Sequence, residues 1–244
     1  MDRKTLIACA VAASLIGGLA MPALAANPRE LPKLDSRSGR NDAYGLDAPR
    51  AAGAYDLRPP PLRAGTAYAA GLFPLALRLT TPGGSWLGGQ GQSFKTEGQR
   101  PLFGWIELLS SPAGRPRGAI FAVTAYGRTP SVAATVNGLR SRGAGAAYQP
   151  ATQVRLAGFS GTQFDGMVVG ESHVFVPFSP PAHVATFHPD AFKLNRGEVF
   201  RVVVLDVEGK TVVVFVENAA LPAERFPAFL NLANRILGSL RLAK

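Results

Sequence analysis

Six side chains that could act as acids, bases or metal ligands are concentrated in one stretch of the second half of the chain. Histidines and carboxylates in one window could bind zinc, or could supply the acid and base of a hydrolase. The histidines are separated by ten and five residues, and this spacing matches no compact ligand motif. We therefore treat the group as a weak candidate polar site and expect no catalytic, cofactor or metal site. Its members are Asp165, Glu171, His173, His183, His188 and Asp190.

A serine lies between glycines in the segment 158–161 (GFSG), which invites comparison with the nucleophile elbow of hydrolases. That elbow needs G-x-S-x-G between a strand and a helix, so that the serine is exposed above the helix N-terminus. Here the fifth position is Thr162, and a strand pattern follows instead of a helical one. The segment is therefore predicted to be a tight turn between two strands.

The segment 83–91 (GGSWLGGQG) is rich in glycine. A loop that cradles phosphates needs the lysine-hydroxyl ending of a P-loop or a dinucleotide fingerprint leading into a helix, and neither is present. We predict a flexible loop around Trp86, whose indole would be a core anchor.

The elements that would position these groups follow from the period of the apolar residues. Alternation at Leu75, Leu77 and Leu79 predicts a half-buried strand. A dense β-branched hairpin is predicted over 198–217, and because it is apolar on both faces it should lie centrally with both sides covered. Further strands are predicted over 102–108, 118–123, 152–156, 162–169 and 174–178.

Two helices are predicted. The first lies near 130–142, with Thr129 as a possible cap, Pro130 in the first turn, and an apolar face that includes Val136. The second is C-terminal, and its apolar face is formed by Phe226, Phe229, Leu230, Ala233, Leu237 and Leu240. The expected fold class is α+β, with a curved, mostly antiparallel β-sheet covered by the C-terminal amphipathic helix and by the helix near 130–142.

The N-terminus has the pattern of a signal peptide over residues 1–25, with two basic residues, an uncharged apolar run and a small-x-small site that ends at Ala25. The alternative is a retained anchor, but the apolar run is short for a span and Pro22 precedes the cleavage site. Cys9 is the only cysteine, and it lies too early for lipidation. We expect cleavage after Ala25, a cysteine-free mature chain with no transmembrane segment, and a secreted or periplasmic location.

Residues 26–66 are rich in Pro, Arg and Gly and show no apolar period. Such a segment cannot bury enough surface to offset the entropy of ordering it, so we predict a disordered linker. Residues 67–244 are then expected to form a single α+β domain.

The chain is basic, with 26 Lys and Arg against 16 Asp and Glu and a formal net charge of +10. Attraction to anionic envelope polymers or phospholipid head groups is one explanation. The codon usage of a GC-rich genome, which favours Arg, Ala, Gly and Pro, is the other. The basic residues are scattered and lack a basic-aromatic signature, so no specific nucleic acid is expected as a partner.

Two parts of the chain resemble uncharacterised exported proteins of GC-rich bacteria: 64–86 (AGTAYAAGLFPLALRLTTPGGSW), and 156–166 (LAGFSGTQFDG) together with 197–242. The order of hairpin, helix and final S-L-R segment is similar to a wider fold. That fold includes an extrinsic subunit of photosystem II (the PsbP-like fold) and a nuclear-transport cofactor. The resemblance implies a curved antiparallel sheet covered by helices, and accessory or binding roles that are mostly non-catalytic.

Together these features predict an exported, non-catalytic accessory or binding domain that acts in the periplasm or cell envelope. Its partner would be an unknown envelope protein or a small ligand. Two alternatives stay open. One is a secreted hydrolase that uses carboxylates such as Asp165, Glu171 or Asp190. The other is electrostatic adhesion to anionic envelope polymers.

Overall fold

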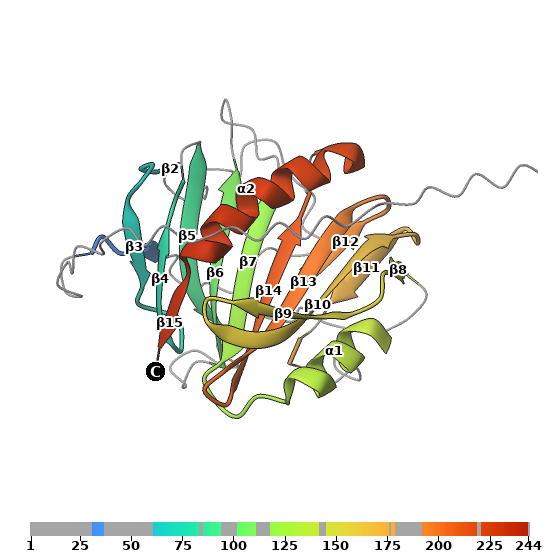
Figure 1. Ribbon diagram of the computed structural model, residues 1–244, viewed down its shortest axis with the longest axis horizontal. Coiled ribbons are helices and arrows are strands. Elements are labelled where there is room, and N and C mark those ends of the chain that lie inside the picture. Colours follow the sequence, from blue (N-terminus) through green and yellow to red (C-terminus); the bar gives the residue numbers. More distant parts are fainter. Residues whose placement is uncertain are drawn as a thin grey trace, which may run out of the picture. The chain divides into compact units, whose positions relative to one another are not determined.

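The structure is a computed structural model, and the predicted leader over 1–25 lies outside its described residues. Those residues belong to the α+β class, with a mostly antiparallel sheet that is not closed and two α-helices (Figure 1). They contain no helix of the length and apolar character that a membrane span requires. The described residues are 31–36, 61–82, 85–93, 102–110, 118–141, 145–175, 177–178, 192–218 and 221–243.

Within this part of the chain, ten strands form the main sheet, in the order β1-β5-β6-β7-β14-β13-β10-β8, with β2 paired to β5 and β9 paired to β10. All of these pairs are antiparallel except β1 with β5. The strands are β1 (Asp35–Ser36), β2 (Pro61–Leu62), β5 (Trp86–Ser93), β6 (Phe103–Ser110), β7 (Gly118–Ala125), β8 (Ala146–Tyr148), β9 (Thr152–Leu156), β10 (Phe159–Val168), β13 (Val199–Val207) and β14 (Lys210–Glu217).

Two smaller sheets and the helices complete the described fold. One small sheet has the order β15-β4-β3 and the other is the pair β11-β12. The strands are β3 (Ala67–Ala70), β4 (Ala76–Thr80), β11 (Ser172–Phe175), β12 (Phe192–Asn195) and β15 (Arg241–Ala243). The helices are α1 (Val132–Ser141), the short 3-10 helix η3 (Ala223–Arg225) and α2 (Phe226–Ser239).

The β13–β14 hairpin divides the interior into two cores, because successive side chains of a strand point to opposite faces. Val203, Leu205 and Val214 belong to the core on one face, which we call the first face. Val204 and Phe215 belong to the core on the other, the second face. The prediction that this hairpin is central is confirmed: β14 lies between β13 and β7, and its residues from 211 to 216 are all buried.

Each core includes residues of one helix. On the first face, Phe229 of α2 packs against Trp86, with ring centroids 6.2 Å apart. On the second face, Val136 and Leu139 of α1 join the core that contains Phe215. Figure 1 shows α2 running across the sheet and α1 at the lower right of the view, below the labels of β9 and β10.

The start of α1 differs from the prediction. Ser131, not Thr129, caps the helix, since its Oγ accepts a hydrogen bond from the backbone N of Ala134 at 3.2 Å. The hydroxyl of Thr129 instead accepts from the backbone N of Thr211, at 2.9 Å. This contact ties the segment before α1 to the first residues of β14.

The linker prediction for 26–66 is wrong for two stretches, which form β1 and β2. Leu34 is 1% exposed and belongs to the first-face core. Its backbone N donates to the carbonyl of Ala69 at 2.9 Å, and its carbonyl accepts from Nε2 of Gln90 at 2.6 Å. One apolar side chain and its hydrogen bonds thus anchor a segment whose composition is that of a linker.

The prediction of a flexible loop over 83–91 is wrong from Trp86 onward, because β5 begins there and pairs along its length with β6. Trp86 is buried, so its prediction as a core anchor is confirmed. Gly88 is required by packing, since a Cβ there would lie 2.5 Å from Cδ1 of Leu62. Gly88 therefore serves close approach within a sheet.

Candidate functional site

Asp165 is held by Arg201, its direct cross-strand partner between β10 and β13, on the first face. Nε and Nη2 of the arginine donate to Oδ1 and Oδ2 of the carboxylate, and both distances are 2.7 Å. The Asp165 side chain is 34% exposed and that of Arg201 is 19% exposed. A two-pronged, charge-assisted pair of this kind uses both carboxylate oxygens. Asp165 could act as a general base only after the pair had opened.

His173 lies in β11, is 5% exposed and contacts Tyr148 of β8. The Tyr148 hydroxyl is 3.2 Å from Nε2 of His173 and donates to the carbonyl of Leu139, also at 3.2 Å. A hydroxyl has one proton: when Tyr148 donates it to Leu139, Nε2 of the imidazole is the donor toward the tyrosine oxygen, and in the other tautomer Nε2 accepts that proton. Burial lowers the pKa of His173 below the usual value, so the neutral ring is favoured.

Arg140, near the end of α1, lies over the Tyr148 ring at 5.7 Å from its centroid, and over that of Phe164 at the same distance. Burial raises the pKa of Tyr148, and the positive charge of Arg140 opposes that rise. Gly145 is required here, because a Cβ at that position would lie 2.6 Å from Nδ1 of His173. The imidazole is thus enclosed on several sides.

The predicted polar residues are only partly described. Glu171 is exposed in the turn before β11, where its carbonyl accepts from the backbone N of Arg196 at 2.9 Å. Asp165 lies on the first face, whereas His173 contacts Phe175 of the second-face core, with ring centroids 4.4 Å apart. The structure therefore does not bring these two together. His183, His188 and Asp190 lie outside the described residues, so the six-residue site as a whole stays a prediction.

Two carboxylates that the sequence analysis did not single out lie on the second face. Glu107 of β6 is 1% exposed. Glu217 of β14 is partly exposed as a residue, but its carboxyl group is surrounded by protein atoms. Burial, with the charges of Glu198 and Glu107, raises the pKa of Glu217 to about 8. A glutamic acid of this kind keeps its proton at neutral pH. The signal in the sequence is a lone acid at the end of an otherwise apolar strand.

Strand register relates Glu217 to Tyr148, the partner of His173. Tyr148 pairs with Gly166, Gly166 with Phe200, and Phe200 with Glu217. Direct partners point to the same face, so Tyr148 and Glu217 belong to one row on the second face. Gly166 makes room in that row, because a Cβ there would lie 2.4 Å from Cζ of Phe200. The row contains Tyr148, which contacts His173, and the protonated carboxyl group of Glu217. These groups can donate hydrogen bonds and hold protons.

No metal site is evident in this part of the chain: the described residues contain no group of three or more His, Cys, Asp or Glu side chains that could hold a metal ion. Among the described residues, the exposed large apolar side chains are Leu102, Met167 and Val169, at 40%, 41% and 43%. Two of these three lie at the end of β10, beside the edge strand β8.

No protein-family model matches the chain, and no curated protein matches it. Among solved structures it is similar to cyanobacterial PsbP (CyanoP) from Synechocystis sp. PCC 6803, with 11% identity and a TM-score of 0.35 over 68% of this chain and 86% of that one. It is also similar to LpqN of Mycobacterium tuberculosis, described as involved in cell envelope biogenesis, with 12% identity and a TM-score of 0.27 over 76% of this chain and 90% of that one. TM-scores this low leave the family unassigned.

Proposed function

We propose that this chain is an exported, non-catalytic accessory domain that binds a partner protein of the cell envelope. The signal-peptide pattern over 1–25 supports export. The observation that carries the binding role is the pair of exposed apolar side chains, Met167 and Val169, at the end of β10. Single exposed apolar residues are common on protein surfaces, but two at one edge of a sheet favour a contact surface.

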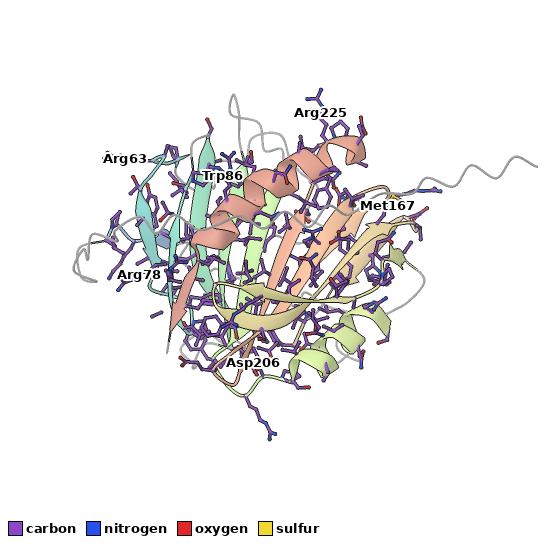
Figure 2. The ribbon with its side chains drawn as sticks, viewed as in Figure 1. Arg63, Arg78, Trp86, Met167, Asp206 and Arg225 are labelled. Atoms are coloured by element: carbon purple, nitrogen blue, oxygen red, sulfur yellow. The ribbon has the colours of Figure 1, made fainter. Side chains whose placement is uncertain are left out.

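The surroundings of this pair suit a partner that approaches the sheet edge. β8 is the last strand on its side of the main sheet and has only three residues. Met167 pairs with Ala147 of β8 and with Val199 of β13, so it stands among small and β-branched residues. In Figure 2, Met167 lies toward the right of the view, whereas Arg63 and Arg78 lie at the left. The contact would therefore combine these apolar residues with the exposed charges of Glu171 and Arg196 close to the end of β10.

The state of the polar candidates supports a role without catalysis. Both oxygens of Asp165 are bonded to Arg201, and His173 is buried against Tyr148. An enzyme needs an acid or base that can reach its substrate. Asp165 and His173 are instead engaged in side-chain contacts within the fold, and Glu171 is exposed.

Site-specific photo-crosslinking in the producing cell tests this function. A crosslinking residue at Met167 or Val169 should give a defined adduct with an envelope protein. The same residue at Leu102, which is equally exposed but lies at the start of β6, should not. The double substitution M167D/V169D should abolish co-purification of that protein. Equal adducts from position 102, or none from 167 and 169 in the exported protein, would exclude this surface.

A hydrolase remains the second candidate, and the raised pKa of Glu217 is the observation that favours it. A carboxylic acid that stays protonated near neutral pH is typical of a general acid, but the enclosed Glu217 carboxyl could meet a substrate only after the side chains around it had moved. Screening the processed protein against ester, amide and glycoside substrates would find such an activity. It should vanish in E217Q and persist in D165N, since Asp165 lies on the opposite face.

A further inference from the structure

The outer face of the three-stranded sheet β15-β4-β3 has a row of positive charges. Arg78 of β4 is the direct partner of Ala69 in β3 on one side and of Arg241 in β15 on the other. Ala69 in turn forms a parallel bridge with Lys33. The lysine side chain follows this face, because its Cδ would lie 3.9 Å from a Cβ at Gly71. We call Lys33, Arg78 and Arg241 the cationic row.

This row faces away from the core. Leu77, Leu79 and Leu242, which alternate with Arg78 and Arg241, are buried in the first-face core. Lys33 and Arg241 are exposed and Arg78 is partly exposed. The other residues of the outer face are small or short, namely Ala67, Ala69, Ala76, Thr80 and Ala243. The three long basic side chains therefore stand above a low surface.

The described stretches that form this sheet carry little negative charge. Within the described stretches 31–36, 61–82 and 238–243, the only acidic residue is Asp35. Arg63 adds a further cation, and its carbonyl accepts from Oγ1 of Thr81, directly after β4. Arg241 donates from Nη1 to the carbonyls of Gly238 and Leu240. Among the described residues, the row has no ion pair with a carboxylate.

Like charges directly opposite each other on neighbouring strands oppose folding. The pairing of Arg78 with Arg241 is such an arrangement, although Arg241 also donates to two carbonyls at the end of α2. A local conflict of this kind, with no carboxylate paired to it among the described residues, points to a function that needs the charges together.

We propose that this face docks on the surface of an anionic phospholipid bilayer. The charge of the row is complementary to lipid phosphates, and its described neighbours on the outer face are small residues, which suits a planar partner. A polysaccharide or a nucleic acid would be favoured by aromatic side chains for stacking, and the described strands of this sheet expose none on their outer face, since Tyr68 of β3 is buried. Access to an outer bilayer surface rests on the predicted export, whereas the cationic row itself does not depend on the apolar partner surface proposed above.

Vesicle co-sedimentation of the processed protein tests the proposal, with mixed phosphatidylglycerol and phosphatidylcholine vesicles against phosphatidylcholine alone. Binding should need the anionic lipid and should disappear in high salt, because salt screens exposed charges. Removing two cations in R78Q/R241Q should weaken binding about 30-fold, from roughly fivefold for each cation near an anionic surface. K33Q/R78Q should weaken binding to a similar extent. It retains Arg241, whose hydrogen bonds to the carbonyls at the end of α2 are then undisturbed.

The matched control is R128Q/R235Q, which removes the same net charge from exposed positions before α1 and on α2. It should bind like the unchanged protein. An equal loss in this control would show that overall charge is responsible and would overturn the proposal, as would binding to phosphatidylcholine alone. Binding to a soluble polyphosphate that is tighter than binding to the bilayer would also overturn it, in favour of a polymer ligand. Circular dichroism of each variant shows whether a loss reflects unfolding.

Discussion

The Phe229 ring of α2 lies directly over Gly118 of β7: a Cβ at position 118 would be 2.5 Å from Cζ of the ring and 2.6 Å from Cε2. The same ring packs against Trp86. Absence of a side chain at Gly118 therefore lets the helix approach the sheet and fixes the position of Phe229 over it.

We predict that G118A destabilises the fold, because the added methyl displaces Phe229 from Trp86. Overpacking of this kind costs about 1–3 kcal/mol. Denaturant unfolding followed by tryptophan fluorescence measures it. The control is G138A in α1, where nothing lies within 4 Å of the new Cβ. Alanine should raise stability there by about 0.5–1 kcal/mol, since glycine is unfavourable within a helix. Equal behaviour of the two variants would contradict this explanation.

His173 should make stability fall in mild acid. Burial lowers its pKa in the folded state, so the unfolded chain binds the proton more readily. The free energy of unfolding should therefore decrease as the pH falls below about 6.5, the value for an exposed histidine. H173Q should remove this part of the pH dependence, as judged by urea unfolding at several pH values. An unchanged slope in H173Q would assign the acid sensitivity to other groups.

Glu217 should change the free energy of unfolding with pH in the opposite direction, so that stability falls as the pH rises. Its folded-state pKa of about 8 lies above that of the unfolded chain, so the stability it contributes is complete below the unfolded value and is lost as the pH rises through 8. E217Q should be more stable than the unchanged protein at pH 8, by about 4 kcal/mol, because each unit of the pKa difference corresponds to about 1.4 kcal/mol. Below pH 4.5 the two should be alike. A variant that is less stable at pH 8 would show that the carboxylate form is the favoured one.

The Asp165–Arg201 pair should contribute modestly to stability. Its geometry is good, but both side chains are partly exposed, so solvent screens much of the attraction. A double-mutant cycle with D165N and R201Q should give a coupling of about 0.5–1 kcal/mol. The coupling should shrink in high salt. A coupling near zero would mean that the pair positions side chains without stabilising the fold.

The strand and helix pattern could be predicted where burial is regular. Leu75, Leu77 and Leu79 alternate in the sequence and are all buried in the structure. The hairpin turn is formed by Glu208 and Gly209, with φ of 51° and 81°, as expected for a tight turn between strands. In both cases the chemistry of a few neighbouring residues is sufficient, because the determining contacts are local.

Other features depended on residues far apart in the chain. The strand character of 86–93 could not be predicted, because glycine has no intrinsic preference for a strand and is required here by Leu62. The role of Leu34 likewise depends on Ala69 and Gln90. The sequence shows Asp165 as a free acid, whereas the pairing of β10 with β13 gives it Arg201.

By itself, the sequence determined the signal-peptide pattern, the basic charge, the α+β class and the central hairpin, since each follows from composition or from a short-range period. Only the tertiary structure decided which charges meet. Strand register places Arg78 beside Arg241, although 162 positions separate them in the numbering, and it places Glu217 in one row with Tyr148. Register is set by the packing of whole sheets, so no local pattern of residues contains it.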